Sequence, residues 1–317
     1  LNCGIEASAD AICLGESVQL QASSNVAVVN DSCSWTQVSG GDCYRLIAGP
    51  NGKLFIPRRT DLLKSIDNGL TWSNANWPLG IVRSGTSLSG GAVYNFVTNQ
   101  YSQCAVDNGY WVSNNDGGSF TQTGPTGFGC VGAEMFQLNN GLTLATMGGF
   151  QRGIYKSNNL SNNTWTNRYG GVDPNDFASF GDSIIFCATT NNIVKSANQG
   201  DSWTSVMSGS YNDVEIMGDS LFWINSSGSL FISQMNSVSG SIAARSSLGA
   251  GSFDMIYDAN TDLLFVCKNN SGIYISEDHG YNWTLCAVPG VTNYSYITVY
   301  QGRLYVGTNI GLYSKDL

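Results

Sequence analysis

An all-β fold, in which one structural unit repeats around a closed ring, is predicted by three features of this 317-residue sequence. First, an eight-residue pattern, Ser-x-Asp-x-Gly-x-x-Trp, recurs along the chain. Second, a pair of apolar runs joined by a tight turn precedes each copy. Third, the last repeat stops before its final strand, and a matching strand stands near the N-terminus. These features predict a seven-bladed β-propeller closed by its own chain ends.

The recurring pattern describes a turn between two antiparallel strands. Residues 65–72 and 276–283 fit it completely, residues 113–120 and 196–203 carry Asn at the Asp position, and residues 157–165 form a looser copy. A short carboxylate or amide can bond the N–H groups of its own turn, glycine supplies a positive φ, and the terminal aromatic ring packs on the hairpin. We therefore predict a structural role for Ser65, Asp67, Gly69, Trp72, Asn115, Gly117, Phe120, Trp165, Asn198, Gly200, Trp203, Asp278, Gly280 and Trp283.

The spacing of the strands gives the number of blades. Strands leading into the turns are predicted at residues 61–65, 109–113, 153–157, 192–196, 229–233, 272–276 and 311–314. Two apolar runs come before each of them, as at residues 46–57 and 214–225, and have the pattern of buried strands. Each unit thus supplies four strands. The fifth unit has lost its turn pattern at residues 233–236 and is predicted to be the most irregular.

The chain ends are predicted to meet. The last unit reaches Leu317 without a fourth strand, and residues 34–40 match the fourth strand of another unit at residues 202–209. The N-terminal strand at about 34–40 should therefore pair with the C-terminal blade. This gives one propeller domain over residues 32–317.

Residues 1–31 form a predicted strand pair that resembles the first strands of Ig-like or PKD-like modules. Two strands alone cannot bury a core. They would pack against the propeller flank, or pair with a neighbouring chain by β-augmentation. The second alternative predicts self-assembly through residues 1–30.

The repeated turn resembles the Asp-box, or BNR, repeat of sialidase-like β-propellers, a superfamily that includes polysaccharide hydrolases. In sialidases an aromatic-Arg-Ile-Pro motif opens the first blade, and residues 44–47 (YRLI) are similar to it. The resemblance would make Arg45 one of three arginines that bind a carboxylate. The proline is absent, and the other arginines do not stand in matching contexts. Sialidase activity is therefore not expected.

Composition indicates the compartment and excludes some partners. The net charge is −9 and the pI about 4.4, without a basic cluster, so nucleic acid is not an expected partner. No apolar run is long enough to span a bilayer. The nine cysteines, together with a first residue other than Met, predict an extracellular or cell-surface protein after signal-peptide removal. Seven Asn-x-Ser/Thr triplets permit glycosylation.

The cysteines fall into three predicted groups. Cys104 and Cys130 should face each other on adjacent blades and form a disulfide bond. Cys187 and Cys267 occupy equivalent strand positions and should be buried free thiols. A third group should tie down the N-terminal segment, in pairings that stay open: Cys3, Cys13, Cys33 and Cys43. The pairing of Cys286 stays open as well, and the odd total leaves at least one thiol unpaired or bonded to another chain.

The candidate site lies at the channel mouth, where the innermost strands begin. Alignment of these strands brings several charged side chains to comparable positions, with Glu215 and Tyr296 close by. Such a ring could bind a glycan or a cation, and two facing carboxylates could hydrolyse a glycosidic bond. The alternative is that each Asp only caps its loop. The predicted ligand-binding residues are Arg45, Glu134, Asp176, Asp213, Glu215, Asp254 and Tyr296, and the catalytic candidates are Asp213, Asp254 and Asp176.

Two classes of function are compatible with this pattern. The first is a secreted, non-catalytic propeller that binds a glycan or an extracellular protein, or that builds an extracellular assembly. The second is a glycoside hydrolase with two carboxylates at the channel mouth. We expect no cofactor and assign no metal ligands. A histidine-based zinc site is excluded because His279 is the only histidine and lies in a turn, and calcium stays possible although no loop signature indicates it. The first class is favoured, since a fold alone carries no activity.

Overall fold

The computed structural model describes residues 4–7, 20–23, 33–78, 88–95, 100–105, 109–123, 135–147, 152–160, 164–238 and 242–317. The chain divides into two compact units, Leu1–Ser34 and Trp35–Leu317. In the first unit, β1 (Gly4–Ala7) and β2 (Leu20–Ser23) form a two-stranded antiparallel sheet. Its kinship to Ig-like modules and its role in self-assembly stay predictions.

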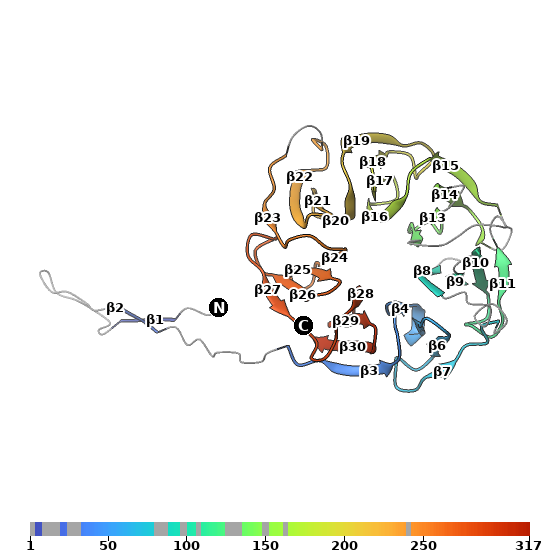
Figure 1. Ribbon diagram of the computed structural model, residues 1–317, viewed down its shortest axis with the longest axis horizontal. Helices are drawn as coiled ribbons and strands as arrows, with labels where there is room; N and C mark the ends of the chain where they lie inside the picture. The colour runs from blue at the N-terminus through green and yellow to red at the C-terminus, as the bar shows by residue number, and fades with distance from the viewer. Residues whose placement is uncertain are drawn as a thin grey trace, which may run out of the picture. The chain divides into compact units, whose positions relative to one another are not determined.

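The second unit is a seven-bladed β-propeller, as the sequence predicts. Seven four-stranded antiparallel sheets are arranged around a central axis, and within six of them chain order runs from the innermost strand outward (Figure 1). Within the described ranges, no helix is long and apolar enough to cross a membrane. The first three blades comprise β4 (Ile47–Ala48), β5 (Leu54–Pro57), β6 (Leu62–Ser65) and β7 (Ser73–Asn74); β8 (Leu88–Asn95), β9 (Gln100–Ala105), β10 (Gly109–Ser113) and β11 (Thr121–Thr123); and β12 (Met135–Gln137), β13 (Thr143–Met147), β14 (Gly153–Ser157) and β15 (Thr166–Gly170).

Blades four to six follow the same order, and the outer strand of blade five is as short as that of blade one, at two residues. The strands are β16 (Pro174–Phe180), β17 (Ile184–Thr189), β18 (Asn192–Ser196) and β19 (Thr204–Ser208); β20 (Tyr211–Met217), β21 (Ser220–Asn225), β22 (Ser229–Gln234) and β23 (Ser246–Ser247); and β24 (Phe253–Asp258), β25 (Leu263–Lys268), β26 (Gly272–Ser276) and β27 (Thr284–Cys286).

The seventh blade closes the ring with strands from both ends of the propeller. It contains β28 (Tyr294–Tyr300), β29 (Arg303–Thr308) and β30 (Gly311–Asp316), and its outermost strand is β3 (Thr36–Gly40). The register of β3 and β30 places Thr36 opposite Ser314 and Gly40 opposite Gly311. The predicted closure is therefore confirmed.

The core lies between neighbouring blades. Phe55 and Leu62 of blade one pack with Tyr94 and Tyr101 of blade two. Between blades five and six, a similar cluster contains Phe222, Leu230, Met255 and Leu264. Because most blades are covered on both faces, the middle strands read as continuous apolar runs rather than as alternating ones.

The repeated turns are held by a serine and by the acid or amide two residues later. In blade one, Ser65 Oγ donates to Asp67 Oδ1 over 2.7 Å and accepts the N–H of Gly69 over 2.9 Å. Asn68 and Gly69 have φ values of 61° and 84°. The hydrogen bonds from Thr71 and Ser65 lower the pKa of Asp67 to about 2. Equivalent serine and glycine bonds hold the turns at Gly117, Gly200 and Gly280.

The cysteines differ in part from the prediction. Cys187 and Cys267 are buried free thiols, as predicted, and Cys33 and Cys286 are both disulfide-bonded. The expectation that Cys43 forms a disulfide bond is wrong. Its thiol is free, because the residue is buried in an apolar cluster with Leu46, Ile56 and Leu312. Outside the described part of the chain lie Cys3, Cys13, Cys130 and the side chain of Cys104, and with them the predicted bond between Cys104 and Cys130.

Candidate functional site: an acidic central cavity

One position of the innermost strands carries an acid on three consecutive blades. The position is found from the residue that comes after it, which in each case pairs with the neighbouring strand of the same blade. That following residue is Phe177 in β16, Val214 in β20, Met255 in β24 and Ile297 in β28. The position itself is therefore occupied by Asp176, Asp213, Asp254 and Tyr296. Arg45 stands just before β4 of blade one, and Glu134 lies outside the described residues.

Each of these aspartates bonds the innermost strand of the next blade. Asp176 Oδ2 accepts the N–H of Val214 over 3.3 Å, and Asp213 Oδ2 accepts that of Met255 over 3.1 Å. The bond from Ile297 N–H to Asp254 Oδ2 is 2.7 Å long. The carboxylates thus stabilise three successive contacts: blade four with five, five with six, and six with seven. This differs from the expected loop cap, because the partner belongs to another blade.

Burial and mutual repulsion keep part of this acidic cluster protonated. Asp213 is 2% exposed, and burial raises its pKa well above the ordinary range, with Asp176, Asp254 and Glu215 adding to the effect. Burial also raises the pKa of Glu215 to about 7. Hydrogen bonds from the backbone of Ile216 and Tyr257 lower this pKa, but their effect is smaller than that of burial. Glu215 is therefore about half ionised at neutral pH.

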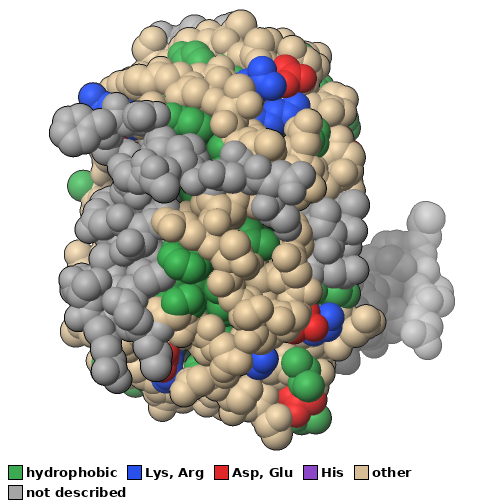
Figure 2. Space-filling model, turned by 90° about the vertical axis from the view of Figure 1, so that its right-hand side faces the viewer, with side chains coloured by type: hydrophobic (Ala, Val, Ile, Leu, Met, Phe, Trp, Pro, Cys, Tyr) green, Lys and Arg blue, Asp and Glu red, His purple; other side chains and the backbone are tan. Residues whose placement is uncertain are grey.

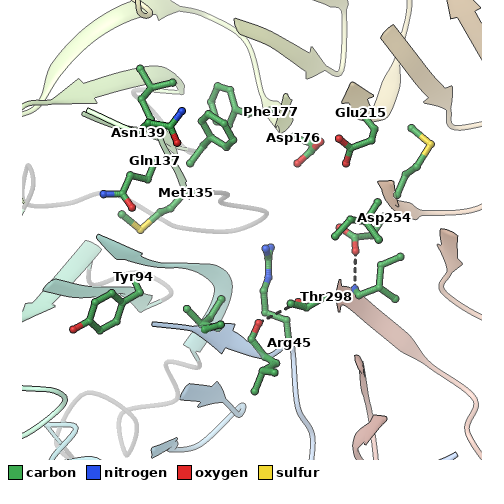
Figure 3. Close-up of a pocket in the computed structure, with 18 residues that line it drawn as sticks. Arg45, Tyr94, Met135, Gln137, Asn139, Asp176, Phe177, Glu215, Asp254 and Thr298 are labelled. Carbon is green, nitrogen blue, oxygen red and sulfur yellow. Dashed lines mark hydrogen bonds between the residues drawn. The ribbon is translucent and has the colours of Figure 1, made fainter. Parts of the chain in front are cut away.

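The larger of two cavities beside this cluster measures about 600 Å³. Figure 3 shows Asp176, Glu215 and Asp254 on one side of it and the side chain of Arg45 extending toward them. The Arg45 guanidinium lies 4.0 Å from the ring centre of Tyr296, which places the cation over the aromatic face. Apolar side chains complete the wall, among them Met135, Phe177, Met255 and Ile297.

The smaller cavity measures about 290 Å³ and is the more acidic one. Asp176 and Asp254 line both cavities, and Asp213 lines only this one. Its lining residues, all of them described, include no Lys or Arg. Three buried oxygen atoms in its wall have no hydrogen-bond partner among the described residues: Asn212 Oδ1, Asp213 Oδ1 and Asn269 Oδ1.

Asn212 and Asn269 are not among the residues that sequence reasoning selected. A signal for Asn212 was available, because Asn-Asp occurs at the same place in two strands, at residues 175–176 and 212–213. Asn269 comes from the turn between β25 and β26, where the sequence gives no sign that it faces the cavity. Within the described ranges, the His, Cys, Asp and Glu side chains form no group of three that could hold a metal ion.

Replacement of Asp254 by Ala should destabilise the propeller by about 1–3 kcal/mol, because the buried N–H of Ile297 loses its acceptor. Asp254→Asn should cost less than about 1 kcal/mol, since the amide oxygen can still accept this bond. Urea unfolding followed by tryptophan fluorescence measures both changes. Equal losses in the two variants would show that the inter-blade bond is not what Asp254 contributes.

The fold and the cavity define the class: a seven-bladed propeller with an acidic centre. No family model matches the sequence, and no curated protein matches it. Solved structures match the fold. "YCF48 bound to D1 peptide" superposes with a TM-score of 0.68 at 12% identity, covering 90% of this chain and 94% of that one. The extracellular domain of BT4673 from B. thetaiotaomicron superposes with a TM-score of 0.67 at 13% identity, covering 88% of this chain and 39% of that one.

A glycoside hydrolase is also similar in fold. The GH74 enzyme of Niastella koreensis superposes with a TM-score of 0.50 at 16% identity, covering 83% of this chain and 53% of the enzyme. At such identities, the likeness establishes the propeller fold alone. Membership of the Asp-box superfamily therefore stays a prediction from the repeated turns.

Proposed function

We propose that this propeller is an extracellular, non-catalytic binding module that recognises a positively charged segment of a partner protein at its central cavities. The observation that carries the proposal is the acid at one position of three consecutive blades, Asp176, Asp213 and Asp254, beside a cavity without a basic side chain in its lining. Acidic walls of low dielectric concentrate the field and attract cationic partners. The net charge of −9 acts in the same direction.

The outer surface supports a site at the centre of the ring. Figure 2 shows one side of the molecule, on which charged side chains are scattered and acidic ones lie beside basic ones. Arg152, for example, pairs with Asp173 at 2.9 Å, and both side chains are exposed. Exposed pairs of this kind cancel at a distance and contribute little to recognition. A cationic partner would therefore find its strongest attraction at the cavities.

Two comparisons support the partner and the compartment. The YCF48 structure is named for its bound D1 peptide, so a propeller of similar size and fold can present a peptide site. The BT4673 match is an extracellular domain. Cys33 and Cys286 are disulfide-bonded, which favours an oxidising compartment.

Binding of charged peptides tests the proposal. Hexalysine should bind the full-length protein, whereas hexaglutamate and cellohexaose should not, and added salt should weaken the interaction. The double variant Asp176→Asn/Asp254→Asn should lose at least about ten-fold in affinity, since it removes two cavity charges and keeps the inter-blade acceptors. The double variant Asp219→Asn/Glu277→Gln removes two exposed charges outside both cavities and is the matched control. Equal losses in both variants, or binding of cellohexaose alone, would refute it.

A glycoside hydrolase is the second candidate, and one observation favours it. A carboxyl with a pKa of about 7, as in Glu215, can act as a general acid near neutral pH, and Asp254 would be the second carboxylate. Release of reducing sugar from a polysaccharide panel, with loss of this activity in Glu215→Gln, would establish an enzyme. The engagement of Asp176, Asp213 and Asp254 in inter-blade bonds favours the binding module instead.

A further inference from the structure

The smaller cavity contains acceptors that lack donors. Asp213 is 2% exposed, and its Oδ1 has no partner among the described residues, although its Oδ2 accepts the N–H of Met255. Asn212 Oδ1 and Asn269 Oδ1 are buried and unpaired in the same sense. Buried polar atoms are almost always hydrogen-bonded in native proteins. Three residues that line one cavity thus each carry a buried, unpaired oxygen, and together they point to a ligand that brings donors.

The charge of the cavity gives the sign of that ligand. Three aspartates line it without a basic residue, and their mutual repulsion helps to raise the pKa of Asp213. A bound cation would relieve this repulsion. The tyrosines and serines in the lining are uncharged and do not oppose a cation: Tyr44, Tyr294, Tyr296, Ser252 and Ser295.

The arrangement of the acceptors distinguishes between kinds of cation. A metal ion held by carboxylates alone is disfavoured, since no three of the described His, Cys, Asp and Glu side chains form a group that could hold one. A guanidinium binds best to both oxygens of one carboxylate. Here Asp213 already uses its Oδ2 for the N–H of Met255, so it offers only Oδ1, and Asn212 and Asn269 each offer one amide oxygen. A primary ammonium has three N–H donors that point in different directions, and it matches such a set.

We propose that the cavity lined by Asn212, Asp213 and Asn269 is a pocket for a primary ammonium group, supplied by a lysine side chain or by a free amino terminus of the partner. This rests on the proposed function, because it names the group that the acidic site recognises. The ammonium donates to Asp213 Oδ1 and to the two amide oxygens, while Asp176 and Asp254 contribute charge from the same wall.

Calorimetric titration of the full-length protein with small model ligands tests the pocket. Nα-acetyl-lysine N-methylamide should bind with one-to-one stoichiometry. Its ε-trimethyl derivative, which has the same charge but no N–H donor, and the arginine analogue should bind at least about ten-fold more weakly. Glycinamide identifies the source: if it binds and the lysine amide does not, the pocket takes an amino terminus, which still supports the proposal.

Variants link the binding to the three oxygens. Asp213→Asn keeps an acceptor for Met255 N–H but removes the charge, and Asn269→Ala removes one amide oxygen; each should weaken the lysine amide at least about ten-fold. Asn236→Ala, at an exposed position outside the cavity, should change nothing. Circular dichroism melting shows whether each variant is folded.

The outcomes separate this inference from the proposed function. If hexalysine binds as expected but trimethylation and Asn269→Ala have no effect, the ammonium pocket is wrong and the acidic binding site stands. If hexalysine does not bind at all, both fail. One-to-one binding of calcium chloride that is abolished in Asp213→Asn would assign the pocket to a metal ion and overturn the inference.

Discussion

Gly307→Ala should prevent closure of the ring and lower the free energy of unfolding by more than about 4 kcal/mol. A Cβ atom at Gly307 would overlap the carbonyl oxygen of Tyr44 and come within 2.8 Å of that of Cys43. These two residues carry the chain from the outermost strand of blade seven into blade one. Cys43 N–H donates to Thr308 over 2.9 Å, and Tyr44 accepts the N–H of Tyr296 over 3.2 Å. The added methyl group would break both links.

Urea denaturation measures this effect, and soluble yield reports complete failure to fold. Gly40→Ala is the matched control, because Gly40 lies in β3 at the same closure and a Cβ there would approach only the Gln37 side chain, at 3.9 Å. It should change stability by less than about 1 kcal/mol. If Gly307→Ala unfolds with the midpoint of the wild-type protein, the packing of the closure differs from the one described.

The propeller was predictable because each repeat encodes its own turn. Ser65, Asp67 and Gly69 make local bonds whose partners lie within a few residues, so spacing in the sequence is enough to place them. Closure was predictable for a related reason, since residues 34–40 have the pattern of the fourth strand that the last unit lacks. Periodic local signals fix the number of blades, and the number of blades fixes the topology.

The candidate site was predictable only in part. Strand alignment brought Asp176, Asp213 and Asp254 to one position, but it could not show that each accepts a hydrogen bond from the next blade. Those partners stand about 40 residues further along the chain and carry backbone donors, which leave no trace in the sequence. The free thiol of Cys43 was mispredicted for a similar reason, because its burial depends on Leu312 at the far end of the chain.

The same bonds connect stability with binding. Each of the three aspartates bonds the next blade through its Oδ2, and each lines the smaller cavity. Close carboxylates repel each other, so a cation bound as we propose would relieve this repulsion. Acidity at the centre is therefore costly to the free protein at neutral pH.

The stability of the propeller should fall by about 3 kcal/mol between pH 4.5 and pH 7 through Glu215 alone. The ordinary pKa of a glutamate, which applies to the unfolded chain, is 4.5, and the pKa of Glu215 in the folded protein is about 7. Below pH 4.5 the group is protonated in both states. As the pH rises, the unfolded chain ionises first and is stabilised, so the folded protein loses stability until the pH passes about 7. Burial of Asp213 raises its pKa as well and adds a loss of the same sign.

At acidic pH, the stability of the propeller should change in the opposite direction and fall as the pH is lowered. Hydrogen bonds lower the pKa values of Asp67 and Asp278 to about 2, so their contribution is present above pH 4 and is lost as the pH falls toward 2. Urea unfolding measured at half-unit steps should therefore show maximal stability near pH 4 to 5 rather than near neutrality.

The variant Glu215→Gln tests the loss of stability that we expect between pH 4.5 and pH 7. The amide cannot ionise, and its oxygen can still accept the N–H of Ile216, which donates to Glu215 Oε1 over 2.9 Å. The variant should exceed the wild-type protein in stability by about 3 kcal/mol at pH 8 and match it within about 1 kcal/mol at pH 4.5. Asp219→Asn, an exposed change in the same blade, should leave the pH profile unaltered. Parallel profiles for Glu215→Gln and the wild-type protein would show that Glu215 ionises normally, and the second candidate function would lose its general acid.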